Sequence, residues 1–212
     1  MRTPNINASL EKTLSRERLE KYFHDSGGDL DVALTIYERN TRLSEAFYAP
    51  LQSLEICFRN SLCFQMAQKY GEDWYKNGLP PLEADALQEI ASAVAELEKG
   101  GGEASLGRIV AELRFSFWVG LIGPRYDTTL WRGALYKAFT ARSGMPRKKV
   151  HGRFNALRRL RNRIAHHEPI FHRPVEQLHN ETIEAISWMC RDTAAWAEHH
   201  SRFNAVYHGH TV

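Results

Sequence analysis

The stretch LQSLEICFRNSLCFQMAQKY, residues Leu51–Tyr70, decides the class of fold. Large apolar side chains recur along all of it, and neither proline nor glycine appears until Gly71 follows its last residue. Glycine often ends a helix, because it adopts the left-handed backbone conformation without strain. The stretch therefore predicts one long, apolar-rich helix that ends near Gly71.

The segments on both sides of this helix have the same character. Apolar residues recur at helical spacing, Asp29 is placed to cap a helix start, and no segment alternates apolar and polar residues convincingly as a strand would. The expected helices span residues 14–23, 29–48, 51–70, 82–98, 106–121, 127–142, 146–165 and 182–199. With no internal repeat and no composition break, they predict a single all-α domain over residues 1–212. We expect a helical bundle of about seven helices, with flexible ends at 1–12 and 201–212.

Composition predicts a cytoplasmic protein without disulfides. No apolar run approaches the roughly 20 residues that a membrane span needs, and the first residues, MRTPNINASLEKT, lack the apolar core of a signal peptide. The three cysteines form no CxxC pair, which favours reduced thiols in the core. The five tryptophans lie at helical positions and are expected to be core residues as well. The histidines near the C-terminus are expected to form a polar tail rather than a metal site.

Positive charge is concentrated in one segment, residues 142–173. This segment holds ten lysines and arginines, a single acid, Glu168, and four histidines. The whole chain has 28 basic and 25 acidic residues, so the remainder is net acidic. Such asymmetry predicts that one surface of the fold meets a polyanionic partner.

The centre of this segment is LRRLRNRIAHHEPIF, residues 157–171, with four arginines and two adjacent histidines. On a helix, Leu157, Leu160 and Ile164 form a buried stripe with Arg161 at its border. Arg161 and His166 are five residues apart, about 140° around an ideal helix. They converge on one phosphate only if the helix ends or distorts between them, and Pro169 favours an end near His166 and His167.

Arginine and histidine together suit cleavage of RNA by its own 2′-hydroxyl. Guanidinium binds phosphate oxygens bidentately, and imidazole transfers protons near neutral pH. Two other interpretations stay open from the residues alone: a basic helix that only binds RNA, and a basic helix that pairs with the chain's own acids. A metal site at His166, His167 and His172 also stays open, although Pro169 breaks the helical H-E-x-x-H spacing. We expect no cofactor and no metal.

The same residues carry a family resemblance. The run from Arg161 to His166, RNRIAH, is similar to the R-x(4–6)-H motif of HEPN-superfamily ribonucleases in its R-N-x-x-x-H form. The longer run NALRRLRNRIAHHEPIF resembles the signature of the Abi-like branch, the bacterial abortive-infection proteins. Further blocks resemble that branch in the same order: LSRERLEKYF, GGDLDVALTIYERNTRLSEAFYAPLQSLEICFRNSL, IVAELRFSFWVGLIG and LWRGAL.

The resemblance implies an all-α bundle of the HEPN type and a metal-independent endoribonuclease acting in phage defence or as a toxin-like effector. It implies a homodimer in which two motifs meet, with RNA as substrate and an antitoxin or small RNA as candidate regulator. By this carry-over Arg161 stabilises the phosphate, Asn162 positions a neighbouring group and His166 is the general acid or base, with His167 auxiliary. The alternative is a non-catalytic module that binds RNA or a protein through the same basic helix. The general RNA-binding residues are expected to be Lys148, Lys149, Arg158, Arg159 and Arg163.

A second group of polar residues interrupts the long apolar helix. Glu55 and Arg59 are four residues apart, with Asn60 adjacent. They could form a salt bridge within the helix, which would contribute a few tenths of a kcal/mol. We expect instead that Glu55, Arg59 and Asn60 face the Arg161 helix and orient its side chains.

Overall fold

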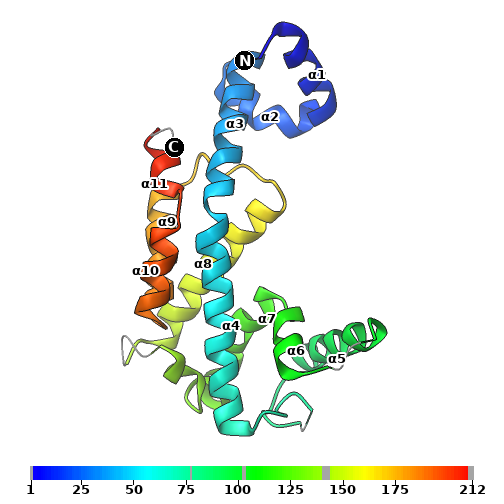
Figure 1. The fold of residues 1–212 in the computed structure, drawn as a ribbon, viewed down its shortest axis with the longest axis vertical. Coiled ribbons are helices and arrows are strands. Elements are labelled where there is room, and N and C mark those ends of the chain that lie inside the picture. The colour runs from blue at the N-terminus through cyan, green and yellow to red at the C-terminus, as the bar shows by residue number, and fades with distance from the viewer. Residues whose placement is uncertain (1, 77, 102–103, 140–143, 210–212) are drawn as a thin grey trace.

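The computed structural model describes residues 2–76, 78–101, 104–139 and 144–209 (Figure 1). In these residues the regular elements are helical and no strand occurs, as the sequence predicts. The α-helices in this part of the chain number eleven, against the expected seven or so. They are α1 (Pro4–Leu14), α2 (Arg16–Asp25), α3 (Leu30–Ala46), α4 (Tyr48–Tyr70), α5 (Ala84–Lys99), α6 (Leu106–Glu112), α7 (Phe115–Leu121), α8 (Arg147–Ala165), α9 (Val175–Ser187), α10 (Arg191–His199) and α11 (Phe203–Tyr207).

Helices α3 and α4 follow one another almost in line and form the long axis of the molecule (Figure 1). Asp29 caps α3 as expected, its side chain accepting a hydrogen bond from the Val32 amide at 3.0 Å. Phe47 between the two helices keeps right-handed helical backbone angles. Pro50 in the first turn of α4 lacks an N–H group, so the hydrogen-bond ladder cannot run unbroken from α3 into α4. At the other end α4 stops at Gly71, as predicted, where φ is 86°.

The core is organised around α4, which contacts α6, α7, α9 and α10. Its buried side chains, including Leu54, Phe58 and Leu62, belong to one large apolar cluster that extends to α8 and α9. A smaller cluster joins α2 to α3 through Leu19, Tyr22 and Leu34. Figure 1 shows α1 and α2, which pack beside α3, at one end of this axis.

Three expected helices are broken in the structure, and two of them divide into separate α-helices. The segment 106–121 divides into α6 and α7 because Leu113 and Arg114 are extended, with ψ of 128° and 154°. This break lets both the Ile109 side and the Trp118 side of the segment enter the core. The segment 182–199 belongs to a hairpin of α9 and α10, with extended Cys190 capping the second helix.

The expected helix 127–142 is not a regular α-helix in its described part. It contains a π-helical turn, η2 (Asp127–Trp131), and a 3₁₀ turn, η3 (Leu135–Ala138), and it follows another 3₁₀ turn, η1 (Pro124–Tyr126). Between η2 and η3, Ala134 leaves helical backbone geometry with φ of −153°. The turns bury Leu130, Leu135 and Phe139 together. Its predicted end at Arg142 lies outside the described residues.

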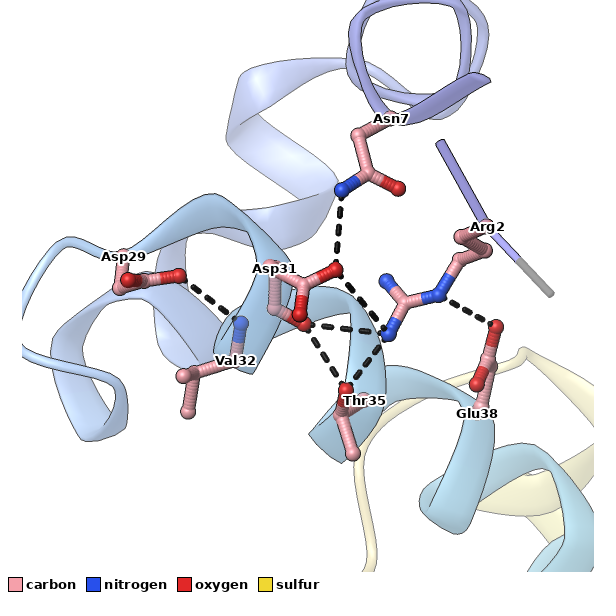
Figure 2. A network of polar contacts seen from close by, with 7 residues as sticks. All are labelled: Arg2, Asn7, Asp29, Asp31, Val32, Thr35 and Glu38. Carbon is pink, nitrogen blue, oxygen red and sulfur yellow. Dashed lines mark hydrogen bonds and ion pairs between the residues drawn. The ribbon is translucent and has the colours of Figure 1, made fainter. Parts of the chain in front are cut away.

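Both segments expected to be flexible ends contain a packed helix. At the N-terminus, the largely buried Arg2 side chain bonds to α3 through the Asp31 carbonyl oxygen, the Thr35 hydroxyl and, at 3.1 Å, the Glu38 carboxylate (Figure 2). From α1, Asn7 donates a hydrogen bond to Asp31 at 2.9 Å. At the C-terminus, α11 places Phe203 fully in the core.

His179 of α9 is a buried polar group beside this C-terminal helix. Its ring stacks on Phe203 with centroids 4.4 Å apart, and its Nε2 lies 2.9 Å from the Ser201 hydroxyl. Burial lowers the pKa of His179 below the ordinary histidine value of 6.5. The folded protein therefore favours the neutral imidazole.

Four tryptophans are buried as expected, and Trp196 is not: 58% of it is exposed at the end of α10. The three cysteines are free, and Cys63 is buried. None of the described helices is both long enough and apolar enough to cross a membrane.

We predict that Arg2→Ala loosens α1 from α3. Loss of the bonds to Thr35 and Glu38 should lower the free energy of unfolding by about 1 kcal/mol. Amide hydrogen exchange over residues 4–14 should accelerate. Arg16→Ala is the matched control, because Arg16 is exposed and its ion pair to Glu11 is 3.9 Å long. Equal protection of α1 in both variants would contradict the anchoring role.

We also predict that stability falls in mild acid because of His179. The unfolded chain binds a proton at higher pH than the folded chain, so stability present above about pH 6.5 is lost as the pH falls. Melting temperatures measured from pH 7.5 to pH 5 should fall less in His179→Phe than in the wild type. The exposed His24→Gln should keep the wild-type slope. Parallel curves of melting temperature against pH for the wild type and His179→Phe would contradict the prediction.

Candidate active site

The RNRIAH motif occupies the last turns of α8, whose inner face is held in the core. Leu157 and Leu160 are buried, and Ile164 packs against the same cluster while partly exposed. The predicted apolar stripe is thus confirmed. Farther back on α8, Phe154 stacks on Phe58 of α4 with ring centroids 4.0 Å apart, so side chains of the two helices are in direct contact.

Backbone geometry ends α8 immediately after the motif. His167 has a φ of 57°, in the left-handed region that follows many helix ends. The His167 amide donates to the Ile164 carbonyl at 3.0 Å, and the Glu168 amide donates to the Arg163 carbonyl at 2.8 Å. These two bonds satisfy carbonyl groups that the helix end would otherwise leave unpaired. From α2, Arg18 donates to the His167 carbonyl at 3.0 Å.

Arg161 meets Glu55 of α4 across an open groove. Its Nε lies 3.3 Å from the Glu55 carboxylate, and the side chains are 42% and 21% exposed, respectively. The groove has a volume of about 460 Å³ and is lined by Tyr48, Leu51, Gln52, Glu55, Ile56, Arg59, Arg161, Ile164 and Ala165. The contact that we expected between Glu55 and the Arg161 helix is present. The ion pair to Glu55 is made at the Nε of the guanidinium, and neither of its two terminal nitrogens donates a hydrogen bond within the described part of the chain.

Arg59 lines the same groove, and Asn60 does not. The Arg59 Nη1 donates to the Ala111 carbonyl of α6 at 3.4 Å. Its Nε is buried without a hydrogen-bond partner among the described residues. No ion pair joins Glu55 to Arg59 there, so the alternative of a salt bridge within α4 is not realised. Asn60 is exposed on the outer face of α4.

His166 and Asn162 lie away from the Arg161 groove. His166 is exposed at the end of α8 and keeps nearly helical angles, with φ of −90° and ψ of 10°. The left-handed turn follows His166 and does not fall between it and Arg161. No bend of α8 between the two residues turns His166 toward Arg161, and their sharing of one phosphate stays a prediction. Asn162 lines a separate pocket with Arg159 and Glu168.

Of the expected RNA-binding residues, three are exposed and have no side-chain partner within residues 2–76, 78–101, 104–139 and 144–209. They are Lys148, Lys149 and Arg159. Arg158 instead donates to Asn155 at 2.9 Å. Arg163 binds the Glu168 carboxylate at 2.8 Å and the Pro169 carbonyl at 3.1 Å, which ties its charge to the helix end.

Other arginines of the basic segment pair with acids elsewhere in the fold. Arg147 binds Asp127 at 3.0 Å, and Arg153 binds Glu184 of α9 at 2.8 Å. Together with the pairs at Arg161 and Arg163, these contacts show that part of the excess charge is neutralised internally. The interpretation of a basic helix that pairs with the chain's own acids is thus correct for these four arginines.

No three His, Cys, Asp or Glu side chains gather as metal ligands would anywhere in the described ranges. His166, His167 and His172 are accordingly not assembled into such a group. The chemistry available at the end of α8 is that of guanidinium, imidazole and two carboxylates, Glu55 and Glu168, each paired with an arginine. Comparisons with models of known families, with curated proteins and with solved structures found no match.

Sequence reasoning missed the residues that surround Arg161 on the side of Tyr48. Tyr48, Gln52 and Ile56 line the groove from successive turns of α4. A signal was present, because residues four apart on a helix share a face and none of these three is charged. An uncharged stripe on an exposed helix face is a pattern that could have identified this side of the groove.

The Glu55–Arg161 pair should contribute little to stability, because both groups are partly solvated. In a double-mutant cycle of Glu55→Gln and Arg161→Gln, we expect a coupling free energy below about 1 kcal/mol from urea unfolding. A coupling well above about 2 kcal/mol would show instead that the pair is a structural tie between α4 and α8.

Proposed function

We propose that this protein is a metal-independent endoribonuclease, of the HEPN type and its Abi-like branch, that acts in the cytoplasm as a phage-defence or toxin-like effector. One observation carries the proposal. A half-exposed arginine of an R-N-x-x-x-H motif lines an open groove, where its Nε is paired with Glu55 and its terminal nitrogens donate no hydrogen bond within the described residues. Its terminal nitrogens are then available to a phosphate, which guanidinium binds bidentately.

In the proposed reaction the 2′-oxygen of RNA attacks the adjacent phosphorus while the bond to the 5′-oxygen breaks. A base removes the 2′ proton, and an acid supplies a proton to the leaving 5′-oxygen. The products are a 2′,3′-cyclic phosphate and a 5′-hydroxyl. Arg161 stabilises the charge that develops on the phosphate oxygens. DNA, which lacks the 2′-hydroxyl, is not cleaved by this route.

Two proton transfers suit a homodimer. His166 points from a different side of α8 than Arg161, since five residues correspond to about 140° of helix rotation. A two-fold axis near the ends of α8 would bring His166 of one copy toward Arg161 of the other and supply two imidazoles to one cleft. In this arrangement Asn162 and His167 position neighbouring groups. Lys148, Lys149 and Arg159 attract the RNA backbone, and an antitoxin or a small RNA restrains the activity.

A second function, binding of RNA or a protein without cleavage, is favoured by a different observation. Arg147, Arg153, Arg161 and Arg163 already have acidic partners, and His166 does not line the Arg161 groove. A module of this kind would bind RNA with an affinity that falls steeply with salt and would leave it intact.

Cleavage of RNA in EDTA tests the proposal. We expect turnover without divalent metal, products with a cyclic phosphate end, and a loss of about 10²–10⁴-fold in rate for His166→Ala. His24→Ala is the matched control, because His24 is exposed and remote from the motif in sequence. RNA that stays intact, or degradation that His166→Ala leaves unchanged, would refute the enzyme and leave the binding module.

A further inference from the structure

Tyr48 stands between two grooves. It lines the Arg161 groove on one side, and on the other side it lines a groove of about 430 Å³ with Arg42, Glu45, His200, Arg202 and neighbouring apolar residues. The Tyr48 side chain is at the start of α4 and 69% of it is exposed. The exposed Tyr48 ring can therefore contact a ligand that occupies both grooves.

Beyond the second groove, the exposed surface continues to another aromatic side chain. Trp196 is 58% exposed, and the centroid of its ring lies 4.6 Å from that of His200, which lines the groove. One exposed aromatic ring, that of Tyr48, thus lines the second groove, and the other, that of Trp196, lies beside His200 of its lining. Such rings provide flat apolar faces on which bases stack, whatever their identity.

Cations outnumber acids along these grooves. Arg42, Arg59, Arg161 and Arg202 line them, against two carboxylates, Glu45 and Glu55. The Arg202–Glu45 pair is 3.6 Å long with both side chains mostly exposed, so a phosphate can displace it at little cost. Each groove has the volume of a small-molecule site and is too small for a duplex.

We propose that single-stranded RNA reaches the Arg161 groove along a track that crosses Tyr48 and continues over Arg42, His200 and Arg202 to Trp196. This inference rests on the proposed function, since it supplies the route of the substrate to that site. The arginines bind backbone phosphates, while Tyr48 and Trp196 stack on bases. The exposed cations of α8, Lys148, Lys149 and Arg159, do not define this track.

Fluorescence anisotropy with a labelled single-stranded RNA of about ten nucleotides tests the track. Binding is measured in the His166→Ala background, so that the probe stays intact. We expect Tyr48→Ala and Trp196→Ala each to weaken binding about tenfold, and Tyr48→Phe to bind like the parent. Arg42→Gln with Arg202→Gln should weaken binding and reduce its dependence on salt.

Matched controls come from a different pocket, which Arg132 and Tyr136 line together. Tyr136 is 47% exposed in η3, and Arg132 is an exposed arginine paired with Asp127 at 3.0 Å. Tyr136→Ala and Arg132→Gln should leave binding unchanged. Thermal melts of all variants check that they fold. Substitution of an exposed tyrosine should not change the melting temperature.

The outcomes separate this inference from the proposed function. If the parent binds RNA and the wild type cleaves it, but the Tyr48 and Trp196 variants bind normally, the track is wrong and the enzyme stands. Loss of binding in Lys148→Gln with Lys149→Gln alone would place the RNA on α8. If Tyr48→Ala changes the mass seen by light scattering, the stripe on α4 is a subunit contact and the track is overturned. Absence of RNA binding and cleavage in the wild type removes both proposals.

Discussion

The stack of Phe58 on Phe154 is the contact on which the candidate site depends. Both rings are fully buried, and their close approach sets where α4 and α8 cross. Glu55 is three residues before Phe58 on α4, and Arg161 is seven residues after Phe154 on α8. Since these spacings return to the same helix face, the crossing directs Glu55 and Arg161 toward one another. An apolar contact in the core thereby determines the surroundings of a surface arginine.

The basic segment has two different physical roles. Some of its arginines join helices, as Arg153 does with Glu184 of α9, or secure a helix end, as Arg163 does with Glu168. Others, such as Arg159, are exposed and have no partner in the described part of the chain. Charge counted along the sequence therefore overstates the charge that a polyanion would meet. It is the exposed remainder, together with half-exposed Arg161, that is relevant to RNA.

The proposed site and the proposed track meet at Tyr48. The track brings together the end of α3, the start of α4 and the ends of α10 and α11, which are far apart in sequence. Figure 1 shows why this is feasible, since α10 and α11 run beside the axis formed by α3 and α4. A chain of helices folded back on itself can thus line one surface with residues from both of its halves.

Local sequence determined the helical class of the fold, the cap at Asp29, the end of α4 at Gly71 and the buried stripe of α8, because each depends on propensity or on neighbours within a few residues. Only the tertiary structure decided where 106–121 and 182–199 break, because those breaks serve to bury apolar residues on more than one side of a segment. It also decided that Arg161 pairs with Glu55, that His166 stays outside their groove, and that Trp196 is exposed. These outcomes depend on how the helices cross. The spacing of residues along one helix carries no information about that crossing.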